Sequence, residues 1–232
     1  MRFVLLIGGF LFDQPYTSRV KLFKQYRDLI LKLSEIHEFC IVTGGGSLAR
    51  ESIKLLDSFG VRPTIKDKIG IMVTVLNASI LTYILQPKAV YIDLNRLDDV
   101  IHHLESGKIV VTGGLSPGQS TDAVAALLSE LIGAEILVKA TDVDGLYSTD
   151  PRIDKNAVKI DNISVNELIK LLSKQNFSPG TYEVFDLVAA KILKRSGIPC
   201  RIVDGRNVEN VLYAIEGKEI GTLIFSSGVE GG

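Results

Sequence analysis

An apolar, β-branched run that ends in consecutive glycines occurs three times in this chain, and this feature constrains the fold most. The runs are "RFVLLIGG", "EFCIVTGGG" and "KIVVTGG", which end at Gly8-Gly9, Gly44-Gly45-Gly46 and Gly113-Gly114. Near-continuous apolar runs are typical of strands covered on both faces of a parallel sheet. Ligands of such sheets bind beyond the carboxyl ends of the strands, where glycines let backbone N–H groups approach an anion. The repetition favours a phosphate site over turns that need glycine for structural reasons alone.

Helical patterns alternate with these runs and complete the fold prediction. Apolar residues at three- and four-residue spacing predict a helix over residues 18–36, and further helices are expected over 47–60, 67–85, 98–106, 120–134, 164–174, 187–197 and 207–217. Strands are expected over residues 89–93, 135–141, 199–205 and 221–225, with turns over 146–161 and a loop over 175–186. This order predicts an α/β fold: a three-layer αβα sandwich with an open, mainly parallel sheet. Residues 1–232 are expected to form one domain.

Composition excludes several classes of function. The formal net charge is -1, so no general basic field indicates nucleic acid as a partner. Cys40 and Cys200 are expected to be buried, reduced thiols, and the three histidines to be surface residues without metal-ligand spacing. The first apolar run lacks a small-x-small cleavage site, and the stretch over residues 70–85 is too short and polar to span a bilayer. We therefore expect a cytoplasmic protein.

The glycine turns do not match common nucleotide or hydrolase motifs. The chain has no G-x-x-x-x-G-K-[ST] and no G-x-G-x-x-G after the first run, which disfavours P-loop and dinucleotide-binding folds. It has no G-x-S-x-G elbow either, so an α/β-hydrolase is disfavoured.

Five segments resemble a known family in order and spacing. "TGGGSLAR", "DKIG...T..NA", "TGGLSPGQSTDAVAALLSE", "ATDVDGLYSTDP" and "SPGTYEVFD" are similar to the amino acid kinase superfamily, and within it to the archaeal-type uridylate (UMP) kinase branch. The resemblance implies transfer of the γ-phosphoryl group of Mg·ATP to UMP, with no protein-held metal. It also implies a homo-oligomer, commonly a hexamer built from dimers, with residues 1–140 as the acceptor half and 141–232 as the ATP half.

The resemblance also implies roles for individual residues. The catalytic residues would be Arg50 and Asp122. The ATP-binding residues would be Gly8, Gly9, Phe10, Gly46, Arg50, Thr141, Tyr147 and Asp150. The UMP-binding residues would be Gly45, Asp67, Leu115, Ser116, Pro117, Gly118, Gln119, Ser120 and Thr121.

Several of these residues, and the turn that precedes Tyr147, also have purely structural interpretations. Arg50 could be a solvated helix arginine, and Asp67 could be the N-cap of the helix it opens. Asp122 could be a favourable charge at a helix N-terminus. The pair Asp144-Gly145 could form a type I′ hairpin turn.

A lysine that relatives carry near the end of the first strand is absent here. The corresponding positions hold Leu6 and Phe10. Lys68, Lys139 and Lys191 are candidate replacements, although each is more simply a surface residue. The absence leaves two alternatives to a UMP kinase: a superfamily kinase with another acceptor, and a non-catalytic nucleotide- or oxyanion-binding protein. The first long helix could form a dimer face or could pack on its own sheet.

Overall fold

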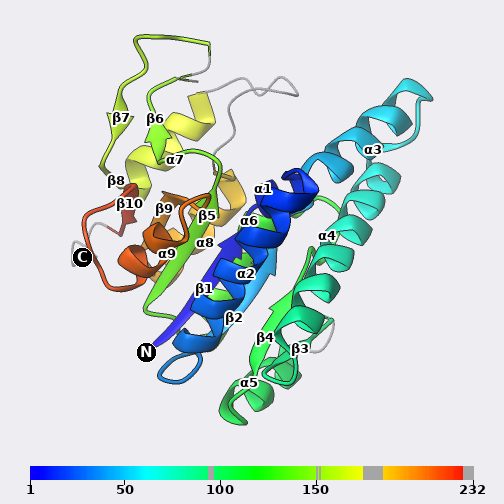
Figure 1. Cartoon of the computed structure of the whole chain (residues 1–232). Coiled ribbons are helices and arrows are strands. Elements are labelled where there is room, and N and C mark those ends of the chain that lie inside the picture. Colours follow the sequence, from blue (N-terminus) through cyan, green and yellow to red (C-terminus); the bar gives the residue numbers. More distant parts are fainter. Residues whose placement is uncertain (94–96, 150, 152, 175–184, 227–232) are drawn as a thin grey trace.

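One eight-stranded sheet forms the centre of the computed structural model, which describes residues 1–93, 97–149, 151, 153–174 and 185–226 (Figure 1). The strand order is β3-β4-β2-β1-β5-β9-β10-β8, and every neighbouring pair is parallel except β9 with β10. The strands are β1 (Arg2–Ile7), β2 (Glu38–Thr43), β3 (Ala89–Tyr91), β4 (Ile109–Thr112), β5 (Ile136–Thr141), β8 (Asn162–Ser164), β9 (Cys200–Asp204) and β10 (Thr222–Phe225). The predicted mainly parallel sheet is confirmed.

Helices cover both faces of the sheet because side chains alternate between faces along each strand. Phe3, Leu5 and Ile7 of β1 pack in one core with α2 (Tyr16–Leu33), α4 (Pro63–Leu85) and α9 (Val208–Ile215). Val4 and Leu6 pack in the other core with α5 (Leu97–Glu105), α6 (Thr121–Ile132), α7 (Val165–Lys174) and α8 (Leu187–Ser196). The predicted three-layer αβα sandwich is therefore confirmed.

Two helices stand at the carboxyl edge of the sheet, where the glycine turns lie. α1 (Phe10–Asp13) follows β1, and α3 (Gly46–Ser58) follows β2. Figure 1 shows α3 and the first turns of α4 projecting beyond this edge.

Side-chain caps fix the starts of the later helices. Ser120 caps α6 by accepting from the N–H of Ala123, and Gly133 ends that helix with a φ of 61°. Asp186 caps α8 by accepting from the N–H groups of Val188 and Ala189. Ser120, and not the neighbouring Thr121, is therefore the N-cap of α6.

The prediction that Asp67 opens its helix is wrong. α4 begins at Pro63, so Asp67 lies in the second turn and cannot be the N-cap. Proline is favoured at the first helical position because its φ is already helical and its missing N–H is not needed there.

The prediction of a type I′ turn at Asp144-Gly145 is also wrong. That turn needs a positive φ at both central residues, whereas in the described residues only glycines have one. The hairpin lies further on, where β6 (Leu146–Tyr147) pairs antiparallel with β7 (Lys159–Ile160). Of the loop predicted over 175–186, residues 175–184 lie outside the described part of the chain.

The expectation that residues 70–85 are too short and polar to span a bilayer is corrected by the length of the helix that contains them. α4 has 23 residues and is long and apolar enough to cross a membrane by length and composition, and no other helix among the described residues is. In this fold α4 instead packs on the central sheet as one of the helices that cover it. Val73, Asn77 and Leu81 on one side of it are buried against the sheet. Its other side is apolar and exposed.

The two cysteines are free and buried, as predicted. Burial raises the pKa of the Cys40 thiol to about 12 and raises that of Cys200 as well. The prediction of surface histidines holds for His102, which is exposed, but His37 and His103 are half-buried.

Candidate functional site

A cavity of about 580 Å³ lies at the carboxyl edge of the sheet, between α3, α4 and the start of α6. It brings together residues that the sequence analysis selected from segments far apart in the chain: Gly45, Gly46, Arg50, Asp67, Gly118, Gln119, Ser120 and Thr121. Ala49, Ile53, Gly70, Ile71, Thr74 and Gly114 complete its lining. The glycine ends of β2 and β4 therefore face one space, as expected for a ligand site of a parallel sheet.

The glycine turns also pack against one another. A Cβ on Gly9 would overlap the backbone of Gly46, and a Cβ on Gly44 would lie 2.8 Å from the backbone N of Gly9. A Cβ on Gly113 would lie 2.7 Å from the backbone of Thr74 in α4. Glycine is thus required for packing here, so the structural and the ligand-binding interpretations of these turns hold together.

Polar side chains of α4 hold two of the turns in place. The Thr74 hydroxyl accepts a hydrogen bond from the N–H of Gly114 at 2.7 Å. The Asn77 amide donates to the carbonyl of Gly44 at 2.8 Å, and the Thr43 hydroxyl donates to the carbonyl of Thr74 at 2.9 Å. Thr74 and Asn77 belong to the "T..NA" pattern of the sequence but were not among the predicted site residues. Their role is to fix backbone groups at the cavity.

Asp67 connects α4 to the loop before α6. Its Oδ2 accepts from the N–H of Gly118 at 2.9 Å. Gly118 has a φ of 81°, in the left-handed region that glycine adopts most easily.

Only the second part of the predicted loop 115–121 lines the cavity. Leu115 packs against the core, Ser116 is exposed and Pro117 is half-buried. These three residues do not line it.

The N-terminus of α3 is occupied by a carboxylate from α1. Asp13 Oδ1 accepts from the Ser47 N–H at 2.7 Å and from the Ser47 hydroxyl at 2.9 Å. Asp13 Oδ2 lies 3.2 Å from Arg50 Nη2. Gly45, at the N-cap position of α3, offers no side-chain cap, so Asp13 supplies one. Arg50 is therefore held at the cavity rather than freely solvated, although its side chain is 73% exposed.

Asp13 and Ser47 were not predicted as site residues. They are 34 positions apart, and although Ser47 stands in the "TGGGSLAR" segment, no motif connects it with Asp13. The only available signal was an isolated carboxylate soon after the first glycine turn.

The prediction that Lys139 lies on the surface is wrong. Its Nζ lies 2.5 Å from Asp122 Oδ1, and the two side chains are only 10% and 14% exposed. Burial raises the pKa of Asp122, and Lys139 counteracts this rise. Asp122 thus pairs with a buried cation and is more than a charge at a helix N-terminus. Lys68 and Lys191 are exposed, as predicted.

Of the residues predicted to hold ATP, Gly46 and Arg50 line this cavity, whereas Gly8, Gly9, Phe10, Thr141 and Tyr147 do not. The N–H of Gly8 donates to the carbonyl of Ala140 at 2.8 Å, so the first turn lies beside the end of β5 and Thr141. The Tyr147 hydroxyl donates to Asp144 at 2.8 Å. Asp150 lies outside the described residues.

The side chain of Phe10 is not available to a phosphate. It is 7% exposed and packs in the core with its ring centroid 6.4 Å from that of Tyr26. Phe10 could therefore meet a phosphate only through its backbone at the first turn.

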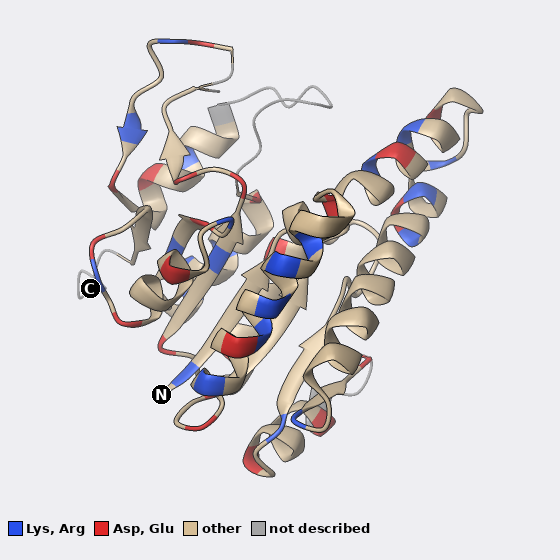
Figure 2. Ribbon diagram, viewed as in Figure 1, with Lys and Arg blue, Asp and Glu red and all other residues tan. Residues whose placement is uncertain are grey.

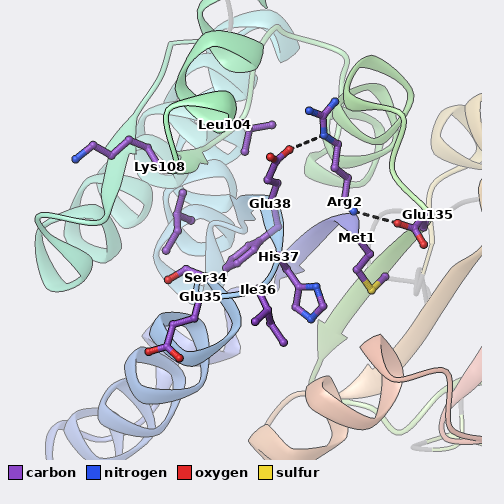
Figure 3. A pocket seen from close by; sticks show the side chains of 13 residues that line it. Met1, Arg2, Ser34, Glu35, Ile36, His37, Glu38, Leu104, Lys108 and Glu135 are labelled. Carbon is purple, nitrogen blue, oxygen red and sulfur yellow. Dashed lines mark hydrogen bonds and ion pairs between the residues drawn. The ribbon is translucent and has the colours of Figure 1, made fainter.

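A second cavity, of about 520 Å³, lies at the amino ends of β1 and β2 (Figure 3). Figure 3 shows Arg2 between two carboxylates: its Nε lies 2.6 Å from Glu38 Oε2, and its backbone N–H donates to Glu135 Oε1 at 3.2 Å. No predicted site residue lines this cavity. It occupies the edge of the sheet opposite the glycine turns, so it is a poor candidate for the predicted chemistry.

Comparison with known proteins agrees with this geometry. The model of the amino acid kinase family matches residues 1–204, and the chain belongs to this family.

Individual relatives show which branch of the amino acid kinase family this chain is similar to. A uridylate kinase from Methanobrevibacter smithii is 37% identical over 226 residues, which cover 97% of this chain and 100% of the relative. One from Hyperthermus butylicus is 41% identical over 204 residues, 88% of this chain and 90% of the relative. The crystal structure of uridylate kinase from Archaeoglobus fulgidus matches with a TM-score of 0.82 at 37% identity, covering 97% of this chain and 100% of that one. The resemblance stated from the motifs is confirmed.

Proposed function

We propose that this chain transfers the γ-phosphoryl group of Mg·ATP to UMP, giving UDP and ADP. The observation that carries the proposal is the cavity lined by Gly45, Asp67 and residues 118–121, in a chain whose full-length relatives are uridylate kinases. These relatives disfavour both alternatives, a kinase with another acceptor and a protein that binds without turnover.

The cavity would hold the acceptor nucleotide. Asp67 can accept hydrogen bonds from a ribose hydroxyl, and the backbone amides and hydroxyls of residues 118–121 suit a pyrimidine edge and a phosphate. The residues that line it come from residues 45–121, which supports assigning residues 1–140 to the acceptor and 141–232 to ATP.

The first glycine turn would meet the ATP phosphates. Gly8, Gly9 and Gly46 lie where β1 and β2 end beside each other, so their backbone can approach a phosphate closely. Thr141 is the last residue of the neighbouring strand β5, and Tyr147 lies in β6. We assign both to the same nucleotide, together with Asp150 from its sequence position.

Mg²⁺ enters this account as part of the substrate Mg·ATP. No group of three His, Cys, Asp or Glu within the described ranges is arranged to hold a metal ion. Mg²⁺ bound to nucleotide phosphates needs only one or two protein ligands and keeps several waters. A metal carried by the nucleotide is consistent with the side chains at this edge.

Phosphoryl transfer needs positioning and charge stabilisation more than covalent chemistry. An oxygen of the UMP phosphate would attack the γ-phosphorus, and the bond to the bridging β–γ oxygen would break to release ADP. Arg50 and the backbone amides of the glycine turns would stabilise the charge on the transferred group. No enzyme-bound intermediate is required.

An acceptor panel tests this function. Purified protein with Mg·ATP is given UMP, CMP, dUMP or no acceptor, and nucleoside diphosphate formation is followed by chromatography. We expect UMP-dependent formation of UDP above all controls. Turnover of a different acceptor with none of UMP would refute the proposal.

We further propose a cytoplasmic homo-oligomer whose dimer face is α4. The apolar residues of α2, namely Leu22, Phe23, Tyr26, Ile30 and Leu33, are buried in the chain's own core, so α2 packs on its own sheet. On α4, by contrast, Met72, Leu76, Ile80 and Tyr83 are 64%, 51%, 40% and 72% exposed. Figure 2 shows that α4 carries no charge beyond its first turns. An apolar stripe of this size is typical of an interface, and a hexamer of such dimers follows the family resemblance.

A further inference from the structure

A buried ion pair lies directly behind the acceptor cavity. Lys139 sits on β5, where it is the register neighbour of Leu6 on β1 and of Ile202 on β9. Its ammonium lies 2.5 Å from the carboxylate of Asp122, the second residue of α6. It also lies 5.4 Å from the ring centroid of Phe185, on the segment that leads into α8.

This pair connects the sheet to the wall of the cavity. Gly118, Gln119, Ser120 and Thr121, which immediately precede Asp122, all line the cavity. The Ser120 hydroxyl donates to Asp186 at 2.8 Å, and Asp186 caps α8. The starts of α6 and α8 and the end of β5 therefore share one polar network at the carboxyl edge.

Stability alone does not account for a charged pair at this place. Removing two charges from water is costly, and well-packed apolar residues often stabilise a core as much or more. Both register neighbours of Lys139, Leu6 and Ile202, are apolar and buried. A lysine between them requires a further reason.

We propose that Lys139 is a positioning residue for phosphoryl transfer. It fixes Asp122, and through it the first turn of α6 and the cavity wall formed by residues 118–121. It also cancels the charge of Asp122 beside the place where the phosphates of both nucleotides would meet. An uncompensated carboxylate there would repel them, because charges interact strongly where water is excluded. This inference rests on the proposed UMP kinase function.

Two variants separate this role from a structural one. Lys139→Met alone leaves Asp122 buried without its cation and is expected to destabilise the fold. Lys139→Met combined with Asp122→Asn removes both charges and is expected to keep a melting temperature near that of the wild type. Lys194→Met, which removes an exposed lysine of α8, is the matched control.

Steady-state UDP formation by the wild type and the variants is the test. For the folded double variant we expect kcat to fall about 100-fold, as displacement of a reacting geometry can cause, with a much smaller change in the KM for ATP. Lys194→Met should match the wild type. A folded double variant with kcat within about threefold of wild type would overturn the inference while leaving the proposed function intact. A wild type that forms no UDP would overturn both.

Discussion

At the scale of single residues, Asp13 and Arg50 determine what the N-terminus of α3 offers to an anion. A helix N-terminus attracts negative charge because its first N–H groups are unpaired and the helix dipole is positive there. In this chain the Asp13 carboxylate accepts a hydrogen bond from the N–H of Ser47 and also forms an ion pair with Arg50. The arginine is therefore oriented before any nucleotide arrives.

Arg50→Met should remove charge stabilisation without unfolding the protein. We expect kcat/KM for UDP formation to fall about 100-fold, as loss of one electrostatic contact to a transition state typically causes. Its exposed ion pair with Asp13 contributes little to stability, so the melting temperature should hardly change. Lys54→Met, one turn further along α3 and also exposed, is the control. Full activity in Arg50→Met would exclude Arg50 from the chemistry.

Asp13→Ala should act on stability instead. It removes the only side-chain cap of α3 described here, and such a loss costs about 1 kcal/mol in the free energy of unfolding. Urea denaturation of this variant beside Asp28→Ala, which changes an exposed aspartate of α2, gives the measurement. Equal midpoints for the two variants would show that the cap contributes nothing.

At the scale of elements, most strands and helices could be predicted because their signals are local. Apolar runs ending in glycine correctly predicted β1, β2 and β4, and helical periodicity correctly predicted α2, α3 and α6. The start of α4 was missed because Pro63 was not recognised as the first residue of a helix. The hairpin was misplaced because Asp144-Gly145 resembles a tight turn locally, whereas β6 pairs with β7, which begins at Lys159, twelve residues after Tyr147.

Contacts across the fold were beyond local patterns. Lys139 lies within an otherwise apolar run, which was a signal of burial, but its partner could not be read from the sequence because Asp122 is 17 positions away on another element. The site residues themselves were found through the family resemblance, not through periodicity.

The turn from β2 into α3 provides a prediction at this scale. Gly46 and Gly60 have nearly equal φ values of 69° and 67°, but a Cβ on Gly46 would overlap Asp13 Oδ1, whereas one on Gly60 meets open space. Both alanine variants should lose about 1 kcal/mol from backbone strain. Gly46→Ala should lose more in thermal denaturation and should also lose most of its UDP formation. Equal stability and activity in the two variants would contradict the close packing of the glycine turns.

At the scale of the whole molecule, α4 has two different faces with two different roles. One face holds the glycine turns through Thr74 and Asn77, and the other exposes an apolar stripe. If that stripe is the dimer face, the acceptor cavity stands beside the interface, because Asp67 and Ile71 of the same helix line it.

Leu76→Glu should convert the oligomer to smaller species. A charge placed in a buried apolar interface is costly unless it is paired, and Leu76 lies at the middle of the stripe. Light scattering coupled to size exclusion gives the mass. Ile36→Glu, at an apolar residue outside α4 that is more exposed than Leu76 (74% against 51%), should leave the mass unchanged. An unchanged mass for Leu76→Glu would exclude α4 as the main interface.

The measurement that tests the central claim most directly is a crystal structure of the protein with UMP. The account predicts the nucleotide in the cavity lined by Gly45, Asp67 and residues 118–121, with its phosphate toward Gly46 and Arg50. UMP bound elsewhere, such as in the cavity at the amino ends of β1 and β2, would contradict the assignment of the acceptor site.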